Sequence, residues 1–255
     1  MHTITITTIQ TTIPASHEDL WGPKKAVGTW LKKKGFTQHG YVHNHETDED
    51  PSYIRQKYPL IQLRCPKGRF MLWGMNEGAE ILQKIMLQEM LRGFQWKGHQ
   101  CYIMPKGTST EKKEIGFLPG KELKWYSLNY FIALNPENAE HWQKQLSAAR
   151  KMERIRELII NNMAMFFTAA GSTLDKKKTK TEIYWIWKSS WETLKIKDIR
   201  TAKIEEYKVI ACTLDYFSNL LLPDGIAIGR QTKLGFGWQT ERKKKSNIDL
   251  LTPFE

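Results

Sequence analysis

The sequence predicts an α+β protein with two ferredoxin-like (RRM-like) domains in tandem. Two observations lead to this fold class. The first half has the order strand, helix, strand, strand, helix, strand, and the second half repeats the opening of that order. This is the order of a split βαβ unit, which RNA-recognition domains share. A chain of 255 residues is long enough for two domains of ordinary size.

The first half opens with a strand and a helix. Residues 2–13, HTITITTIQTTI, alternate apolar and hydroxyl side chains with a period of two, as half-buried strands do. Ser16 and Asp19 form a capping-box pattern for a helix that ends at Gly35. We therefore expect a strand followed by a helix.

Three strands and one helix complete the first half. The runs YPLIQLRC (58–65) and GRFMLWGM (68–75) are expected to be strands joined by a PKG turn. From Asn76 a second helix places apolar residues on one face, and QWKGHQCYIM (95–104) is the expected last strand.

The second half repeats the beginning of this pattern. WYSLNYFIAL (125–134) is an expected strand, and Asn135 with Pro136 supplies a cap for a helix that closes at Gly171. Two long strands follow, TEIYWIWKSSW at 181–191 and KIEEYKVIACTLDYF at 203–217.

The end of the second half departs from the repeat. No second helix is evident there, so the last helix is degraded or missing, or SNLLLPDGIAIG (218–229) replaces it. The turn-rich LPGKEL (118–123) marks the boundary between the halves. We expect an N-terminal domain over residues 1–120 and a C-terminal domain over residues 121–255.

The charge of the chain favours a polyanionic partner. Lys and Arg number 39 against 27 acidic residues, which gives a net charge of +12 and a pI near 9.5. No apolar run has the ~20 residues of a membrane span, and no signal-peptide pattern is present. Nucleic acid is the expected partner, and the cytoplasm is the expected location.

The cysteines predict neither disulfides nor zinc. Cys65, Cys101 and Cys212 form no CxxC pair, and no histidines stand at zinc-finger spacing. We expect the three cysteines to be small buried residues in strands.

A polar segment after the first helix carries residues that suit acid and base chemistry. In YVHNHETDED (41–50), His43 and His45 are two apart, so an extended backbone points both side chains to one side. Imidazole titrates near neutral pH, as a general acid or base must. Arg55 and Lys57 follow closely, and a base beside two cations suits cleavage of a phosphodiester.

Two other interpretations of this segment stay open. Glu46, Asp48, Glu49 or Asp50 would supply a third metal ligand beside the two histidines, but only in a loose site. Alternatively, the segment is a solvated polar loop. We expect no metal and no cofactor.

A glycine-rich loop near the C-terminus is the best candidate for contact with phosphate. In GRQTKLGFGWQ (229–239), bare backbone N–H groups can approach a phosphate, two cations add charge, and an aromatic ring can stack on a base. The candidate residues are Gly229, Arg230, Lys233, Gly235, Phe236 and Gly237. The alternative is an ordinary glycine-bearing hairpin whose Phe236 belongs to the core.

Three lysine runs are further candidates for RNA binding, and one predicted strand is rich in tryptophan. Of the KKK runs at 32–34, 176–178 and 243–245, we assign Lys176, Lys177 and Lys178 to RNA binding, with a solvated face as the alternative. We expect most of the tryptophans of the 181–191 strand, which are Trp185, Trp187 and Trp191, to be core residues.

With these features the sequence resembles the CRISPR-associated, repeat-processing endoribonucleases, the Cas-six family of the RAMP superfamily. Members carry a glycine-rich loop that ends in Gly-Phe-Gly near the C-terminus, which here is Gly235, Phe236 and Gly237. Five further segments, covering most of the chain, look like one branch of the family in the same order: HNH at 43–45, YPLIQLR at 58–64, NEGAEIL at 76–82, IALNPEN at 132–138 and RIRELIINN at 154–162. The chain departs from the family at Ala227, where a further glycine is usual, and in its missing last helix.

The resemblance implies a metal-independent cut in the repeat of a precursor CRISPR RNA. In such enzymes the ribose 2′-OH attacks the adjacent phosphate and leaves a 2′,3′-cyclic phosphate and a 5′-OH. The family places a histidine between the first helix and the second strand, so His45, and after it His43, is the candidate acid or base. Lys57 and Arg55 are the candidates for stabilising the phosphate charge, followed by Tyr41.

Two other functions stay open. The chain can be a non-catalytic RAMP subunit that binds crRNA beside other Cas proteins in an effector complex. It can also be a generic RNA-binding module, whose contacts to phosphate carry no sequence information.

Overall fold

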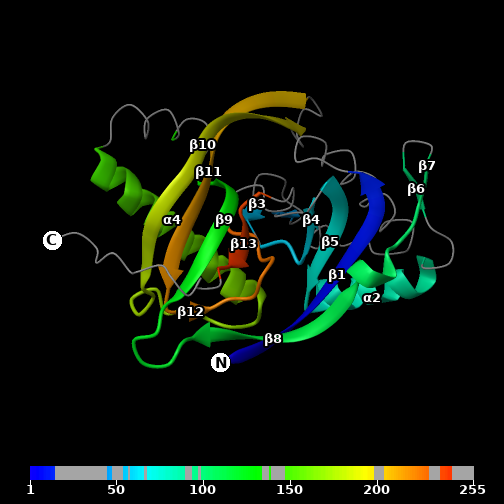
Figure 1. Ribbon diagram of the computed structural model, residues 1–255, viewed down its shortest axis with the longest axis horizontal. Coiled ribbons are helices and arrows are strands. Elements are labelled where there is room, and N and C mark those ends of the chain that lie inside the picture. Colours follow the sequence, from blue (N-terminus) through cyan, green and yellow to red (C-terminus); the bar gives the residue numbers. More distant parts are fainter. Residues whose placement is uncertain are drawn as a thin grey trace.

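The computed structural model describes residues 1–14, 45–47, 54–56, 58–65, 68–89, 94–96, 99–133, 138, 147–197, 204–229 and 236–242. Within these ranges the chain forms two larger antiparallel sheets (Figure 1). The first sheet has five strands and the second has four. The tandem ferredoxin-like α+β fold that the sequence predicts is confirmed.

The first sheet has the ferredoxin-like strand order. Its strands are β1 (His2–Pro14), β4 (Ile61–Arg64), β5 (Arg69–Met75), β8 (Ser109–Phe117) and β12 (Leu220–Leu221). They are ordered β12-β8-β1-β5-β4, so the first strand of the unit pairs with its third and fourth. Helix α2 (Glu77–Glu89) packs against β1 and β5.

The second sheet repeats this arrangement. Its strands are β9 (Lys124–Ile132), β10 (Thr181–Lys197), β11 (Ile204–Ser218) and β13 (Trp238–Glu241), in the order β10-β11-β9-β13. Helix α4 (Ala148–Ala169) follows β9 and buries Ile159 and Phe166 in the core. Ser147 caps its N-terminus, and Gly171, with a φ of +81°, lies just beyond its end as expected. The predicted cap at Asn135 lies outside the described residues.

One predicted strand of the first half is wrong. The segment 95–104 forms a two-stranded hairpin of β6 (Phe94–Trp96) and β7 (His99–Cys101), followed by a single bridge from Ile103 to β1. The fourth strand is β8 instead, after a short 3-10 turn (Pro105–Gly107). The first six residues of β8 are exposed and mostly charged, so the strand has no apolar alternation to reveal it.

A further pair of short strands lies apart from the two larger sheets. β2 (His45–Thr47) pairs with β3 (Ile54–Gln56) as a separate two-stranded ladder. The expected helix ending at Gly35 lies outside the described residues. No described helix is long and apolar enough to cross a membrane.

The segment 218–229 takes the place of the missing last helix. Its residues 220–221 form β12, which pairs with β8, so the second half adds a strand to the first sheet. Between β11 and Gly229 the described chain contains no helix. The change from one sheet to the other falls between Phe117 and Lys124. The division into domains 1–120 and 121–255 stays a prediction.

The two halves share one hydrophobic core. Ile4, Trp73 and Met75 of the first sheet belong to the same buried cluster as Tyr126 and Tyr216 of the second. At the end of α4, the Ala170 carbonyl accepts hydrogen bonds from two side chains of the first half, His2 Nε2 of β1 at 2.7 Å and Asn76 Nδ2 at 3.3 Å. The halves are therefore joined by apolar packing and by specific polar contacts.

Tyr126 holds β12 in place. Its buried hydroxyl donates to the carbonyl of Leu220 at 2.8 Å and accepts from the backbone N–H of Leu222 at 3.1 Å. One side chain of the second sheet thus satisfies two backbone groups of the segment that reaches the first sheet.

We predict that Tyr126→Phe destabilises the protein by about 1–2 kcal/mol, because it leaves a buried N–H and a buried carbonyl without their partner. Chemical denaturation measures the change. The matched control is Tyr184→Phe, which removes a hydroxyl from a ring that is 48% exposed and is expected to change the free energy of unfolding little. Equal effects of the two substitutions would contradict the role given to Tyr126.

Candidate functional site

The base of the glycine-rich loop is a short hydrogen-bonded hairpin. The backbone N–H of Ile228 donates to the carbonyl of Gly237 at 2.8 Å, and that of Gln239 donates to the carbonyl of Ile226 at 2.8 Å. Between them, Ala227 forms a bridge with Trp238. Ala227 is completely buried in this hairpin.

Both ends of the loop lie directly on β9. A Cβ on Gly229 would come within 2.8 Å of the Phe131 ring, and a Cβ on Gly237 would come within 1.8 Å of the Ile228 carbonyl oxygen. Both residues also have positive φ angles, +112° and +69°. The N–H of Gly237 is shared between the carbonyls of Asn129 at 2.9 Å and Tyr130 at 3.0 Å. These two glycines are therefore needed for the close backbone approach.

The β9 segment under the loop is irregular. Tyr130 has a φ of +51°, which is rare for a residue with a side chain, and the register of β9 against β11 shifts here. The Tyr130 N–H donates to the Thr213 hydroxyl at 3.4 Å. Backbone strain of this kind clusters at functional sites, so the strain at Tyr130 supports the loop and the β9 segment beneath it as a candidate site.

Phe236 anchors the loop to the core. Its side chain is 5% exposed and packs in a small cluster with Ile132, Val209 and Ala211, against which Tyr130 also packs. A ring buried in this way does not offer its face to a base. Phe236 thus has the core position that the sequence left as one of two alternatives. Arg230, Lys233 and Gly235 lie outside the described residues.

The predicted catalytic residues are described only in part. The backbones of His45 and Arg55 lie in the β2–β3 ladder, where His45 pairs with Gln56 and Glu46 pairs with Arg55. The backbones of His45 and Arg55 thus lie on neighbouring strands, in adjacent pairs of the ladder, and are not paired with each other. Tyr41, His43 and Lys57 lie outside the described residues.

A buried arginine links the first sheet to the base of the loop. Arg64 of β4 is 2% exposed, and its guanidinium donates to the Gly225 carbonyl at 2.5 Å and to the Leu63 carbonyl at 3.3 Å. It also bonds the side-chain oxygen of Gln62 and lies 5.8 Å from the centre of the Trp73 ring. Burial lowers the pKa of Arg64 to about 10, so the group keeps its charge at neutral pH.

Tyr58 makes a second link to the same hairpin. Its buried hydroxyl accepts from the backbone N–H of Ala227 at 3.2 Å, and its ring contacts that of Phe166. Burial raises the pKa of Tyr58, which keeps the hydroxyl neutral and able to accept this bond. Tyr58 comes directly after Lys57 in the chain. The residue that follows the segment with the predicted catalytic residues is therefore hydrogen-bonded to the base of the loop.

Arg64 and Tyr58 are not among the site residues that the sequence predicts. One signal was available, because a charged residue at the end of the apolar run YPLIQLR is unusual for a buried strand. The partners were not predictable, since Gly225 and Ala227 lie 161 and 169 residues further along the chain.

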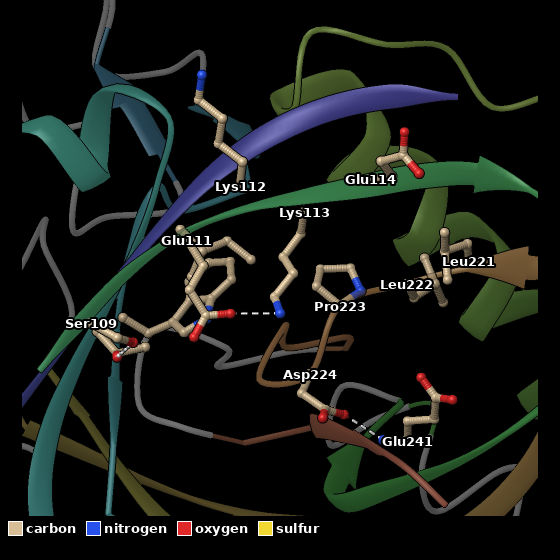
Figure 2. Close-up of a pocket in the computed structure, with 13 residues that line it drawn as sticks. Ser109, Glu111, Lys112, Lys113, Glu114, Leu221, Leu222, Pro223, Asp224 and Glu241 are labelled. Atoms are coloured by element: carbon tan, nitrogen blue, oxygen red, sulfur yellow. Dashed lines mark hydrogen bonds and ion pairs between the residues drawn. The ribbon is translucent and has the colours of Figure 1, made fainter. Parts of the chain in front are cut away.

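A groove of about 640 Å³ separates the exposed part of β8 from the turn after β12, as Figure 2 shows. Its charged lining residues are Glu111, Lys112, Lys113, Glu114, Asp224 and Glu241. Lys113 Nζ lies 2.5 Å from a carboxylate oxygen of Glu111, and Asp224 accepts a bond from the backbone of Glu241. Acidic residues outnumber lysines here, so this groove lacks the positive lining that a polyanion needs.

The predicted basic residues Lys176, Lys177 and Lys178 are all exposed, in a turn between α4 and β10. Lys176 Nζ donates to Asn161 Oδ1 of α4 at 2.7 Å, and Lys178 lies 3.6 Å from Asp175. The role of this turn in binding RNA stays a prediction. Within the described part of the chain, no three His, Cys, Asp or Glu side chains are grouped to hold a metal ion.

Comparisons with known proteins agree with this fold. Residues 2–114 match the family model of the Cas6b N-terminal domain. A crystal structure of Cas6b is similar with a TM-score of 0.66 and 17% identity, and one of the CRISPR RNA processing endoribonuclease Cas6b with 0.60 and 18%. The type IV Cas6 crRNA endonuclease Csf5 follows with 0.57 and 12%. Each comparison covers 94% of this chain and 100% of the other. No curated protein sequence matches.

These findings define the class and then the family. The chain is a tandem ferredoxin-like protein with the fold of the Cas6 proteins. The match of residues 2–114 to the Cas6b N-terminal domain and the shared fold support the resemblance to the Cas-six (Cas6) family that the sequence motifs indicate.

We predict that Phe236→Ala lowers the free energy of unfolding by about 3 kcal/mol, because it leaves a cavity among buried side chains. The same substitution weakens RNA binding, since the loop loses its anchor. The comparison variant is Arg230→Ala, which is expected to weaken RNA binding alone. Thermal melting and RNA titration separate the two effects, and an unchanged melting temperature of Phe236→Ala would show that the ring is no anchor.

Proposed function

We propose that the protein is a metal-independent endoribonuclease that cleaves the repeat of a precursor CRISPR RNA to produce mature crRNA. The observation that carries the proposal is the Cas6b N-terminal domain over residues 2–114 together with a whole-chain fold shared with CRISPR RNA processing endoribonucleases. The net charge of +12 supports a polyanionic substrate. The cytoplasm, where such transcripts are made, is the proposed location.

The proposed reaction is an internal transesterification. The 2′-oxygen of the ribose forms a bond to the adjacent phosphorus while the bond from phosphorus to the 5′-oxygen breaks. A base takes the proton of the 2′-OH, and an acid gives a proton to the leaving 5′-oxygen. The products are a 2′,3′-cyclic phosphate and a 5′-OH.

We assign the acid or base to His45, and to His43 as the second candidate. Lys57 and Arg55 stabilise the negative charge that gathers on the phosphoryl oxygens, with Tyr41 as a further candidate. The short ladder that holds His45 and Arg55 on neighbouring strands supports this assignment. The bond from Tyr58 to Ala227 supports it as well, because it ties this segment to the loop.

The glycine-rich loop is the proposed holder of the RNA. Gly229 and Gly237 fix its two ends on β9, and Arg230, Lys233 and Gly235 lie between them in the sequence. Backbone N–H groups and the two cations are suited to phosphate. Phe236 contributes by anchoring the loop, and Lys176–Lys178 add positive charge.

We predict that a CRISPR repeat RNA is cut at one position in the presence of EDTA, because no step needs a metal ion. The matched substrate carries a single 2′-deoxy nucleotide at the cleavage position and is expected to stay intact, since its nucleophile is missing. Gel electrophoresis with phosphatase treatment of the 3′ end identifies the cyclic phosphate. Cutting of the deoxy substrate at the same position would rule out this mechanism.

We predict that the double substitution His43→Ala, His45→Ala lowers the single-turnover cleavage rate about 100-fold or more, which is the usual contribution of a general acid or base. RNA affinity is expected to change little. His99→Ala is the control, since this histidine lies in the β6–β7 hairpin. Unchanged cleavage by the double variant would show that the catalytic residues lie elsewhere, and binding without any cleavage by the wild-type protein would favour a non-catalytic RAMP subunit.

A further inference from the structure

Large aromatic side chains are exposed on β10. Trp185 is 57% exposed and Tyr184 is 48% exposed. Trp185 is therefore not one of the core tryptophans expected in this strand, and the side chains of Trp187 and Trp191 lie outside the described residues. Exposed aromatic rings in a group, unlike single exposed apolar residues, need an explanation.

The exposed rings belong to a larger cluster on one face of the second sheet. Tyr184 lies 5.6 Å from Phe217 of β11 and 6.1 Å from Trp125 of β9, measured between ring centres, and the latter two are 6.0 Å apart. The next residues along these strands, Tyr126 and Tyr216, are buried in the core with α4. Since side chains alternate along a strand, the cluster lies on the face opposite α4. The register of β10 shifts at Tyr184, so that Trp185 pairs with Asp215, two residues before Phe217, and lies on the same face as Tyr184. We call Trp125, Tyr184, Trp185 and Phe217 the aromatic platform.

A group of lysines adjoins the platform. Lys176, Lys177, Lys178 and Lys180 are all exposed, and we call them the basic turn. Asn219 fixes this turn, because its side chain donates to the Lys178 carbonyl at 2.9 Å and accepts from the Lys180 N–H at 2.8 Å. Asn219 is two residues from Phe217. The basic turn and the platform are thus held at the same end of β10 and β11.

Among the described residues, two acidic side chains lie near the rings of β9 and β11: exposed Glu182, which pairs with Phe217 across the ladder, and Asp215. Asp215 lies two residues from Phe217 and is completely buried, with Arg242 Nε at 3.7 Å from its Oδ1. The Arg242 backbone N–H donates to the Trp125 carbonyl at 2.8 Å, which places this cation next to the platform. Positive charge therefore flanks the rings on β13 and at the basic turn.

We propose that the aromatic platform and the basic turn form a binding surface for single-stranded RNA. Unpaired bases stack on Tyr184 and Trp185, and the backbone phosphates meet the basic turn at Lys177 and Lys180, since Lys176 donates to Asn161 of α4. Stacking of bases on aromatic rings beside a basic track is a general way of holding single strands without sequence preference, and RNA-recognition sheets use their open face in this way. RNA fits better than a protein partner, because the cores of protein interfaces are poor in lysine.

The proposal deepens the proposed function, because it rests on RNA being the substrate and adds where unpaired nucleotides are held. The platform lies on the sheet face away from α4, whereas the loop is held at the irregular part of β9. Binding at the platform is therefore expected to be separable from cleavage.

The test is a titration of labelled octauridine at fixed salt, followed by fluorescence anisotropy. The double substitution Tyr184→Ala, Trp185→Ala is expected to weaken binding roughly tenfold or more, and Trp185→Phe is expected to keep most of the affinity because it keeps a ring. The matched control is Tyr102→Ala, since Tyr102 is also 48% exposed but follows β7 in the first half. Lys177→Gln is expected to reduce the dependence of binding on salt.

Several outcomes overturn the proposal. Equal octauridine binding by the wild-type protein and the double variant overturns it, and leaves protein docking as the reason for the exposed rings. If the double variant does not fold, cross-linking of wild-type protein to 5-iodouridine RNA decides, because adducts on Tyr184 or Trp185 support the platform and adducts only elsewhere refute it. Repeat cleavage measured on the same proteins separates the two hypotheses: binding through the rings without cleavage refutes only the nuclease, and cleavage with unchanged octauridine binding refutes only the platform.

Discussion

The contact between Arg64 and the Gly225 carbonyl is the constraint on which the candidate site depends. A guanidinium that is almost completely buried must have its N–H groups accepted by nearby oxygens, because an unpaired charge in the interior is costly. Gln62 and Leu63 of the same strand supply two acceptors, but the third comes from the second half of the chain. The first sheet therefore reaches its final state only when the 224–228 turn is docked on it.

This docking has consequences for the glycine-rich loop. Gly225 and Ala227 are fixed by Arg64 and Tyr58, and Gly229 begins the loop two residues later. At its other end, Phe236 is buried and Gly237 bonds the irregular part of β9. A loop with fixed ends and cationic residues between them can present its backbone to a phosphate at a small cost in conformational entropy. Fixed ends are a property of a binding loop.

Charge is distributed unevenly over the described surface. The large groove beside β8 is lined by both signs, with Lys113 already paired to Glu111, although the chain as a whole is strongly basic. The basic turn lies instead next to exposed rings on the second sheet, and Asn219 holds it there. The size of a groove therefore does not indicate where RNA binds in this protein. The charges of the side chains that line a surface indicate it.

The sequence by itself determined the fold class and the position of the loop. Periodicity in β1 and α4, the stop at Gly171 and the repeated element order predicted the tandem ferredoxin-like fold, and the glycines around Phe236 identified the loop.

Only the tertiary structure decided the rest. The first six residues of β8 are exposed and leave no apolar pattern, although the strand pairs with β1, and two-residue β12 is too short to have one. The partners of Arg64 and Tyr58 lie more than 160 residues away in the sequence. The apolar pattern of the strand around Trp185 would be the same whether that face of the sheet is covered or exposed. Local patterns record which face of an element is apolar, whereas the folded chain decides what lies against that face.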